Sequence, residues 1–199
     1  ETLRPEHSRP LRIKPFLEAT REVVSNRSTM AATIAMTVLF GAFSSYLASS
    51  ELVIGEIIGR RELFPVLFGG LAGVMGVAMV GNGALVGRLG VARMSRWGLT
   101  AYAAWTTGVA VVAWLSTGPP GVAGYLMAMG PILALHALVF PNLNPVAMQP
   151  MGAIAGTASA VIGTISTAVG ALIGAVIDNA IDGSVVPLAV GFAVCGIAA

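Results

Sequence analysis

The sequence carries very little charge. Only 10% of its 199 residues are Asp, Glu, Lys or Arg, whereas a soluble domain has about 25%. It has one cysteine, Cys195, and two histidines, which excludes an internal disulfide and a cysteine-based zinc site. The net charge is only +2, and no basic patch is interleaved with aromatic residues, so nucleic acid is not expected as a partner. We also expect no metal site and no cofactor.

The few charges leave long apolar stretches between them. Residues 28–50 and 63–87 carry no charge, and residues 97–177 contain one ionisable group, His136. A membrane-spanning helix needs about 20 mostly apolar residues. The first two stretches are each one span long, and the third must hold several. The sequence therefore predicts an all-α integral membrane protein with the lipid bilayer as its surroundings.

Prolines divide the third stretch. "TGPPG" (117–121) and "FPNLNPVAMQPMG" (140–152) should break helices, because proline removes a backbone donor and clashes with the preceding turn. "DNAIDGS" (178–184) predicts a polar turn. The last apolar segment is short, and we expect it to be truncated. These breaks predict six spans, at approximately 28–50, 63–87, 97–116, 122–140, 153–177 and 185–199.

The first 27 residues differ from the rest of the chain. They hold six of the eleven Lys and Arg residues and four of the nine acids, and they have no apolar run, so they are not a signal peptide. Several of their apolar residues fall on one helical face, which predicts an amphipathic helix on the membrane surface. The alternative is a partly disordered linker. The residues on that face are Phe16, Leu17, Thr20, Val23 and Val24.

The positive charges are distributed asymmetrically. If the amino terminus of this chain is cytoplasmic, the inside regions 1–27 and 88–96 hold nine of the eleven Lys and Arg residues. The outside loops hold only Arg60 and Arg61. An excess of positive charge on the cytoplasmic side is the general rule for membrane proteins. We therefore expect 88–96 to be a cytoplasmic loop that anchors the topology.

That loop also resembles a known signature. "GALVGRLGVAR" is similar to the loop motif of the major facilitator superfamily, G-x-L-[AV]-D-R-x-G-R-[KR]. Position 87 is glycine where the family has aspartate, so a charge relay through that aspartate is in question, and the basic pair is reduced to Arg93. The matching residues are Gly83, Leu85, Val86, Arg88 and Gly90.

Three other stretches narrow the resemblance. "ETLRPEHSRPLR", "YLASSELVIGEIIGRRELFPVLFG" and "LVFPNLNPVAMQPMGAIAGTASAVIGTISTAVGALIGAVID" resemble the central cytoplasmic loop, the seventh-to-eighth and the tenth-to-eleventh helix regions of Bcr/CflA-type multidrug transporters. The resemblance implies a six-helix half, helices 7–12, of a twelve-helix major facilitator fold, with residues 1–27 as its central loop. It also implies three-plus-three inverted repeats around a cavity near the bilayer midplane.

The same resemblance implies a function. Such a chain would take part in proton-coupled efflux of drugs or small amphipathic organic molecules across a bacterial inner membrane. Its partners would be the small-molecule substrate, protons and the missing amino-terminal six-helix half. An exporter of a sugar, amino acid or peptide and a non-transporting membrane scaffold are the alternatives.

An enzyme is not expected. The chain has no HExxH motif, no GxSxG motif and no pair of carboxylates within a span, which removes the usual nucleophilic and metal-assisted mechanisms. Asn82 and Asn142 lie near predicted helix ends, where we expect them to cap helices or form turns.

His136 is the only ionisable residue deep within a predicted span. Such a group is a functional hypothesis by default, and histidine changes its charge near neutral pH. His136 is therefore the candidate for proton coupling. The alternative is a neutral imidazole that hydrogen-bonds a neighbouring helix.

Two helical faces are predicted to line the substrate cavity. Each mixes polar and aromatic side chains, as ligand pockets do, although ordinary helix packing uses the same residue types. The candidates are Tyr125, Met129, Ile132, His136 and Phe140 on the fourth span, and Thr33, Thr37, Phe40 and Ser44 on the first.

Small residues form two stripes at helical spacing. In lipid, small residues let helices approach closely, so both stripes are expected to pack helices together. One comprises Gly156, Gly163, Gly170 and Gly174, and the other Gly69, Gly73, Gly76, Gly83 and Gly87.

Overall fold

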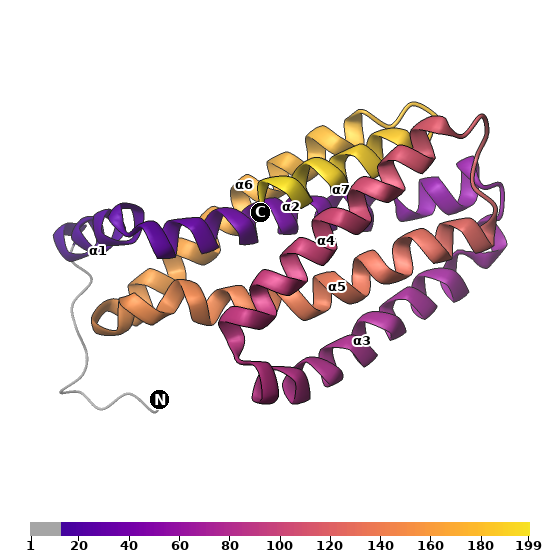
Figure 1. The fold of residues 1–199 in the computed structure, drawn as a ribbon. Helices are drawn as coiled ribbons and strands as arrows, with labels where there is room; N and C mark the ends of the chain where they lie inside the picture. Colours follow the sequence, from indigo (N-terminus) through magenta and orange to yellow (C-terminus); the bar gives the residue numbers. More distant parts are fainter. Residues whose placement is uncertain (1–12) are drawn as a thin grey trace.

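The computed structural model describes residues 13–199, with side chains from Leu17 onward, and this part of the chain is helical without a strand. The first helix precedes six others that run alternately in opposite directions (Figure 1). The helices are α1 (Ile13–Ser25), α2 (Arg27–Leu52), α3 (Phe64–Leu89), α4 (Val91–Leu115), α5 (Val122–Met148), α6 (Ala155–Asn179) and α7 (Val186–Ala198).

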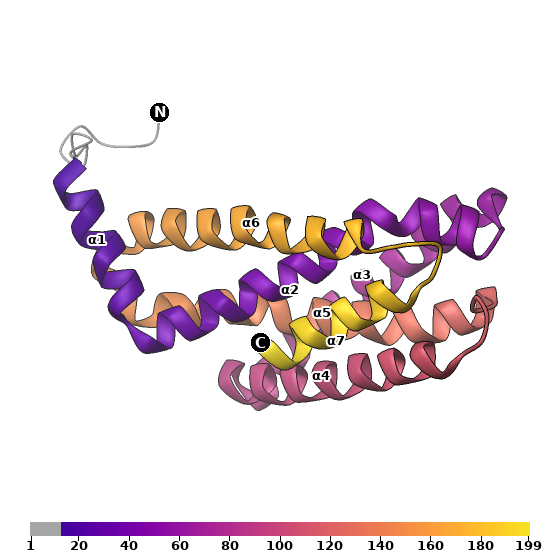
Figure 2. The same ribbon diagram turned by 90° about the horizontal axis from the view of Figure 1, so that it is seen from above.

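Several helices are long and apolar enough to cross a membrane. The qualifying stretches are Arg27–Ile57, Arg61–Leu89, Val91–Leu115 and Val122–Asn179. The last of these contains both α5 and α6, which run antiparallel and are joined by the 3-10 turn Gln149–Ile154 (Figure 2). Helix α7 is apolar but shorter. The chain thus has the helices of a multi-pass membrane protein.

Local sequence sets the starts of these helices. The side chain of Asn26 accepts a hydrogen bond from the Thr29 amide at 3.1 Å and caps α2. Proline occupies the first turn of α3 and of α7, where its missing N–H has no intrahelical partner to lose. The Ser184 hydroxyl accepts a bond from the Val186 amide at 3.1 Å, which helps to fix the start of α7.

The predicted loop 88–96 is wrong. Helix α3 continues to Leu89 and α4 begins at Val91, so a single residue, Gly90, separates them. Gly90 has φ of 79°, a backbone conformation that glycine adopts at little cost. The three arginines therefore belong to helix ends, with Arg88 in the last turn of α3 and Arg93 and Arg96 at the start of α4. The third span begins six residues earlier than expected because the charged stretch continues as helix and does not form a loop.

The predicted break at 140–152 is also wrong in part. Helix α5 runs through Pro141 and Pro145 and ends at Met148. Proline is tolerated in membrane helices because neighbouring helices and side chains satisfy the freed backbone groups. The Thr29 hydroxyl of α2 donates to the carbonyl of Ala147, in the last turn of α5, at 2.9 Å. The turn falls after Met148.

The first helix also differs from its prediction. Val23 and Ala19 are buried where α1 packs against α6 and α2. Leu17 and Val24, placed with Val23 on one face in the prediction, are instead exposed. Phe16 lies outside the residues whose side chains are described. The apolar residues of α1 therefore do not share one face, because some point toward the bundle and others point away from it.

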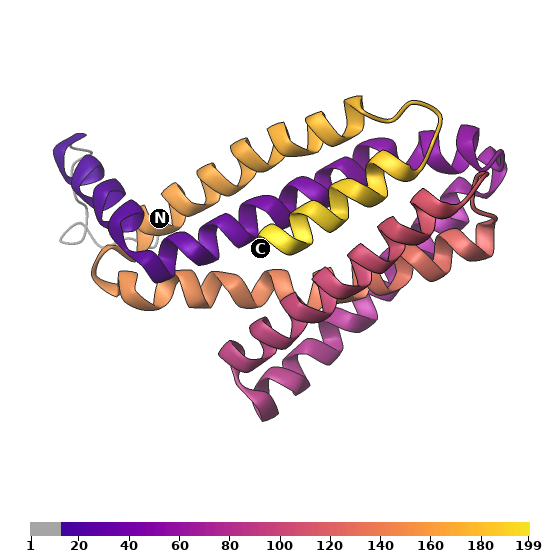
Figure 3. The same ribbon diagram turned by 45° about the horizontal axis from the view of Figure 1, so that its top comes forward.

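Helices α2 to α7 pack in a symmetric pattern. Exchanging α2 with α5, α3 with α6 and α4 with α7 leaves the set of packed pairs unchanged: α2–α6 matches α5–α3, α4–α5 matches α7–α2, and α3–α4 matches α6–α7. The exchanged helices run in opposite directions (Figure 3). This is the pairing pattern of two three-helix units related by an axis across the helices. Helices α2 and α5 pack on each other in the interior.

Candidate functional site

His136 lies in the interior of the bundle, halfway along α5. Its side chain is buried, with 5% exposed. Its ring stacks on Phe43 of α2, with ring centroids 4.9 Å apart, and on Phe140 of its own helix at 5.3 Å. Tyr102 of α4 lies at 6.3 Å in a tilted orientation. Three helices, α2, α4 and α5, therefore hold the imidazole among aromatic rings.

Aromatic rings extend from His136 along the bundle. Phe43 lies 6.1 Å from Tyr46, and Tyr46 lies 5.8 Å from Phe68 of α3. Phe68 in turn lies 5.3 Å from Phe64, at the start of α3. We call the end of the bundle that holds Gly90 the arginine end. The row of rings leads from His136 toward the opposite end.

Several buried polar atoms around this cluster have no hydrogen-bond partner in the described chain. They are His136 Nδ1, the hydroxyls of Tyr102 and Tyr125, and Ser45 Oγ. Buried polar atoms are almost always hydrogen-bonded to protein or to water. These atoms on α2, α4 and α5 therefore have unused capacity for a proton, a water molecule or a polar group of a ligand.

The two predicted cavity faces do not meet. On α5, Tyr125, Met129, Ile132 and His136 are buried and Phe140 is half-buried, so this face does point into the bundle. The other face points elsewhere, because Phe40 and Ser44 of α2 lie against glycines of α6.

The threonines of that α2 face also have local partners. The Thr33 hydroxyl donates to the Thr29 carbonyl and the Thr37 hydroxyl to the Thr33 carbonyl, each at 2.7 Å. Thr37 Oγ1 also lies 3.5 Å from Ser166 Oγ of α6. Helix α2 presents Phe43 to His136 instead. The sequence interpretation missed both Phe43 and Tyr102 as ring neighbours of His136. The i to i+3 spacing of Phe43 and Tyr46 is the signal that could have found this second face.

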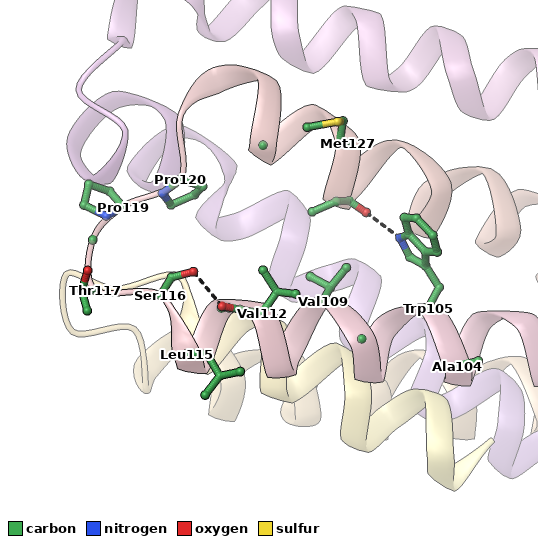
Figure 4. Close-up of a pocket in the computed structure, with 15 residues that line it drawn as sticks. Ala104, Trp105, Val109, Val112, Leu115, Ser116, Thr117, Pro119, Pro120 and Met127 are labelled. Atoms are coloured by element: carbon green, nitrogen blue, oxygen red, sulfur yellow. Dashed lines mark hydrogen bonds between the residues drawn. The ribbon is translucent and has the colours of Figure 1, made fainter.

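Two open cavities among the described residues lie away from His136. The larger, about 910 Å³, is a groove between α4 and α5 near Pro119 and Pro120. In Figure 4, Trp105 reaches across this groove, and its indole N–H donates to the Ala128 carbonyl at 3.2 Å.

The second cavity, about 760 Å³, lies at the arginine end between α2, α4 and α5, and its lining includes Arg93 and Arg96. None of the nine predicted cavity-lining residues lines either space. In this conformation the His136 cluster is closed by side-chain packing.

The arginines at the two ends of the bundle differ in their surroundings. Arg61 pairs with Glu56 at 3.1 Å and Arg60 approaches Glu62 at 3.7 Å, both on the surface. Arg88, Arg93 and Arg96 form no ion pair with an acid of the described chain. Uncompensated positive charge is therefore concentrated at the arginine end.

Of the two glycine stripes, only half of one packs helices together. A Cβ atom at Gly170 would lie 2.8 Å from the Thr37 carbonyl oxygen, and one at Gly174 would lie 2.9 Å from the Gly41 carbonyl oxygen. Those two glycines bring α6 against α2. At Gly156 and Gly163 a Cβ would meet no other described element, so the packing predicted for them is not made within this part of the chain.

The stripe on α3 is open along its whole length. A Cβ at any of its five glycines would meet nothing within 4 Å. The buried residues of α3, Leu67, Leu71 and Asn82, lie on the opposite side of the helix. The prediction that this stripe packs helices together is wrong for the described chain.

Asn82 and Asn142 also differ from their predicted capping and turn roles. Asn142 Nδ2 donates to Asn82 Oδ1 at 2.8 Å, and both side chains are buried. The bond joins α3 to α5. An asparagine within an apolar span needs a hydrogen-bond partner in lipid. The presence of Asn82 and Asn142 in two apolar stretches could therefore have predicted that they pair.

Comparison of this chain with protein-family models, with curated proteins and with solved structures found no match.

Proposed function

We propose that this chain is one six-helix half of a major-facilitator secondary transporter of the Bcr/CflA type, which exports drugs or small amphipathic organic molecules in exchange for protons. The observation that carries the proposal is the exchange-symmetric packing of two oppositely directed helix triplets. Inverted repeats around a central site are a common construction of secondary transporters. The sequence resemblance independently favours the same family.

In this proposal His136 handles the coupling proton in this half. It is the one His, Asp, Glu, Lys or Arg side chain in the interior of the described helices α2–α7, since their Asp, Glu and Arg residues lie at or near helix ends. Protonation would change Nδ1 from an acceptor into a donor. Cation–π attraction to the neighbouring rings of Phe43 and Phe140 would offset part of the cost of charging the buried imidazole.

The row of rings from His136 to Phe64 supports the proposed substrate class. Aromatic faces bind flat apolar or cationic molecules, whereas a sugar or amino acid needs several converging polar groups. In the proposed cycle, separation of α2 from α5 would expose the rings. The amino-terminal half would cover the open glycine stripe of α3, and the arginine end would face the cytoplasm of a bacterial cell.

A transport assay tests this proposal. The native protein, reconstituted in liposomes with an imposed proton gradient, should export a fluorescent aromatic cation such as ethidium. His136→Gln should make the export rate nearly independent of pH between about 5.5 and 7.5, the range in which histidine titrates. The matched control is His7→Gln, which changes the other histidine of the chain and should leave the profile unchanged.

The outcomes separate two failures. An unaltered pH profile in His136→Gln would remove this residue from the coupling mechanism while leaving the transporter proposal intact. No gradient-dependent movement of ethidium or of other amphipathic organic probes by the native protein would reject the transporter proposal itself.

A further inference from the structure

Helix α3 is attached to the bundle at two separate places. Near its start, Leu67 and Leu71 are buried and Phe68 stacks on Tyr46 of α2 at 5.8 Å. At the arginine end its one buried residue is Asn82. Between Leu71 and Asn82 every residue is exposed or half-buried. The first attachment is apolar and broad and extends to Met75, which packs against the core, whereas the one buried side chain at the arginine end is polar.

The polar attachment is a direct hydrogen bond between two side-chain amides. Asn142 Nδ2 lies 2.8 Å from Asn82 Oδ1 and 2.6 Å from the Leu138 carbonyl oxygen of its own helix. It is the one side-chain hydrogen bond found between α3 and another helix in the described residues. Interhelical hydrogen bonds in membranes are individually weak, so a single one can form and break reversibly.

Both helices are easily deformed near this bond. Asn142 lies between Pro141 and Pro145, and each proline removes one backbone hydrogen bond from α5. Asn82 lies between Gly81 and Gly83, and glycine weakens a helix interior. The amide pair therefore joins two segments that can bend.

We infer that the Asn82–Asn142 amide pair is a clasp that holds the arginine end of α3 against α5, and that α3 swings about its aromatic attachment when the clasp opens. The lever from Leu71 to Leu85 is about 21 Å long at 1.5 Å per residue. A modest tilt therefore moves the arginine end by about 5 Å, one helical turn. That this motion opens a path for substrate rests on the proposed function; the clasp itself does not.

Distances between spin labels test the clasp in the full chain in lipid nanodiscs. One label pair, at Leu85 and Gln149, reports the arginine ends of α3 and α5; a second pair, at Val66 and Ala123, reports their opposite ends. All four positions are exposed. The buried Cys195 is replaced by alanine so that only the introduced cysteines react.

The variant Asn142→Ala removes the donor of the clasp. Relative to the parent chain, the ratio of long to short distances for the Leu85–Gln149 pair should rise about 3-fold to about 20-fold, the change that interhelical hydrogen bonds of ordinary strength produce in membranes. The Val66–Ala123 distance should stay unchanged. The matched control is Asn144→Ala, an exposed asparagine two residues further along α5, which should change neither pair.

Three results would overturn the inference. The Leu85–Gln149 distances could be the same in Asn142→Ala and in the parent chain. Both label pairs could broaden together, which would mean that the amide pair maintains the fold rather than one end of α3. Asn144→Ala could act as strongly as Asn142→Ala. Each result is independent of whether the protein transports ethidium.

Discussion

Helices α2 and α3 have the same length and a similar apolar character, yet they occupy opposite environments. Each has 26 residues. The stretch that contains α2 has a mean hydropathy of 1.6 and the stretch that contains α3 a mean hydropathy of 2.1. Thirteen residues of α2 are buried, against three of α3. The more apolar helix is thus the less buried one.

The polar residues of α2 explain this reversal. Its buried side chains include Thr29, Thr33, Thr37, Ser45 and Ser49, most of which donate hydrogen bonds to backbone carbonyls. In lipid the surroundings are as apolar as a protein core, so hydrophobicity alone does not drive a helix inward. Small and hydroxylated residues allow close packing, whereas a uniformly apolar helix can remain at the periphery.

The largest expected loss of stability separates a glycine that packs against another helix from a glycine that contacts none. Gly170→Leu should prevent folding or destabilise the bundle by about 3 kcal/mol or more, because the new side chain would collide with backbone of α2. Gly73→Leu on α3 is the matched change at an open position and, in this chain without an amino-terminal half, should alter stability by less than about 0.5 kcal/mol. Thermal unfolding in detergent measures both. Equal destabilisation would mean that α3 is packed on its glycine side.

Removing buried volume from each helix should have a smaller effect. Leu39 of α2 is fully buried, while Val80 of α3 is 83% exposed. Leu39→Ala leaves a cavity and should cost about 2 to 3 kcal/mol, at the low end for core leucines. Val80→Ala should cost less than about 0.5 kcal/mol. The difference between the two unfolding midpoints is the quantity to compare, and a larger loss for Val80→Ala would invert the assignment of inner and outer helix.

The smallest effect concerns the polar contacts of α2. Thr29→Val keeps the side-chain shape but removes the hydroxyl that donates to the Ala147 carbonyl of α5. The expected loss is about 1 kcal/mol, as for other interhelical hydrogen bonds in membranes. Thr100→Val removes an exposed hydroxyl that bonds within its own helix and serves as the control. If both variants unfold alike, the α2–α5 hydrogen bond contributes nothing to stability.

The sequence was most informative where charge and hydropathy change sharply. Absence of charge over 28–50 and 63–87 predicted α2 and α3 to within a few residues. The start of α4 and the end of α5 were missed because the charged stretch 88–96 was expected to form a loop and proline was expected to break a helix. In a membrane helix, arginine can extend the end into the headgroups, and proline is tolerated where other groups satisfy the backbone.

The site was less predictable than the helices. The sequence predicted that His136 lies deep within a span, and the residue is buried. Its ring partners, however, come from three helices. Spacing along one helix shows which residues share a face and not which helix that face meets. Thr37 and Phe43 both lie on α2, and only the packing shows that one meets α6 and the other meets His136.

The measurement that tests the account most directly is the lipid exposure of α2 and α3 in a bilayer. In this chain studied without an amino-terminal half, nitroxide labels at Thr33 and Met36 of α2, both buried, and at Val77 and Met79 of α3, both exposed, would be probed with oxygen, which concentrates in lipid, and with a water-soluble nickel complex. We predict that the α2 labels collide with neither probe and that the α3 labels collide with oxygen alone. Oxygen-accessible labels on α2, or nickel-accessible labels on α3, would contradict the central placement of α2 in a membrane-embedded bundle.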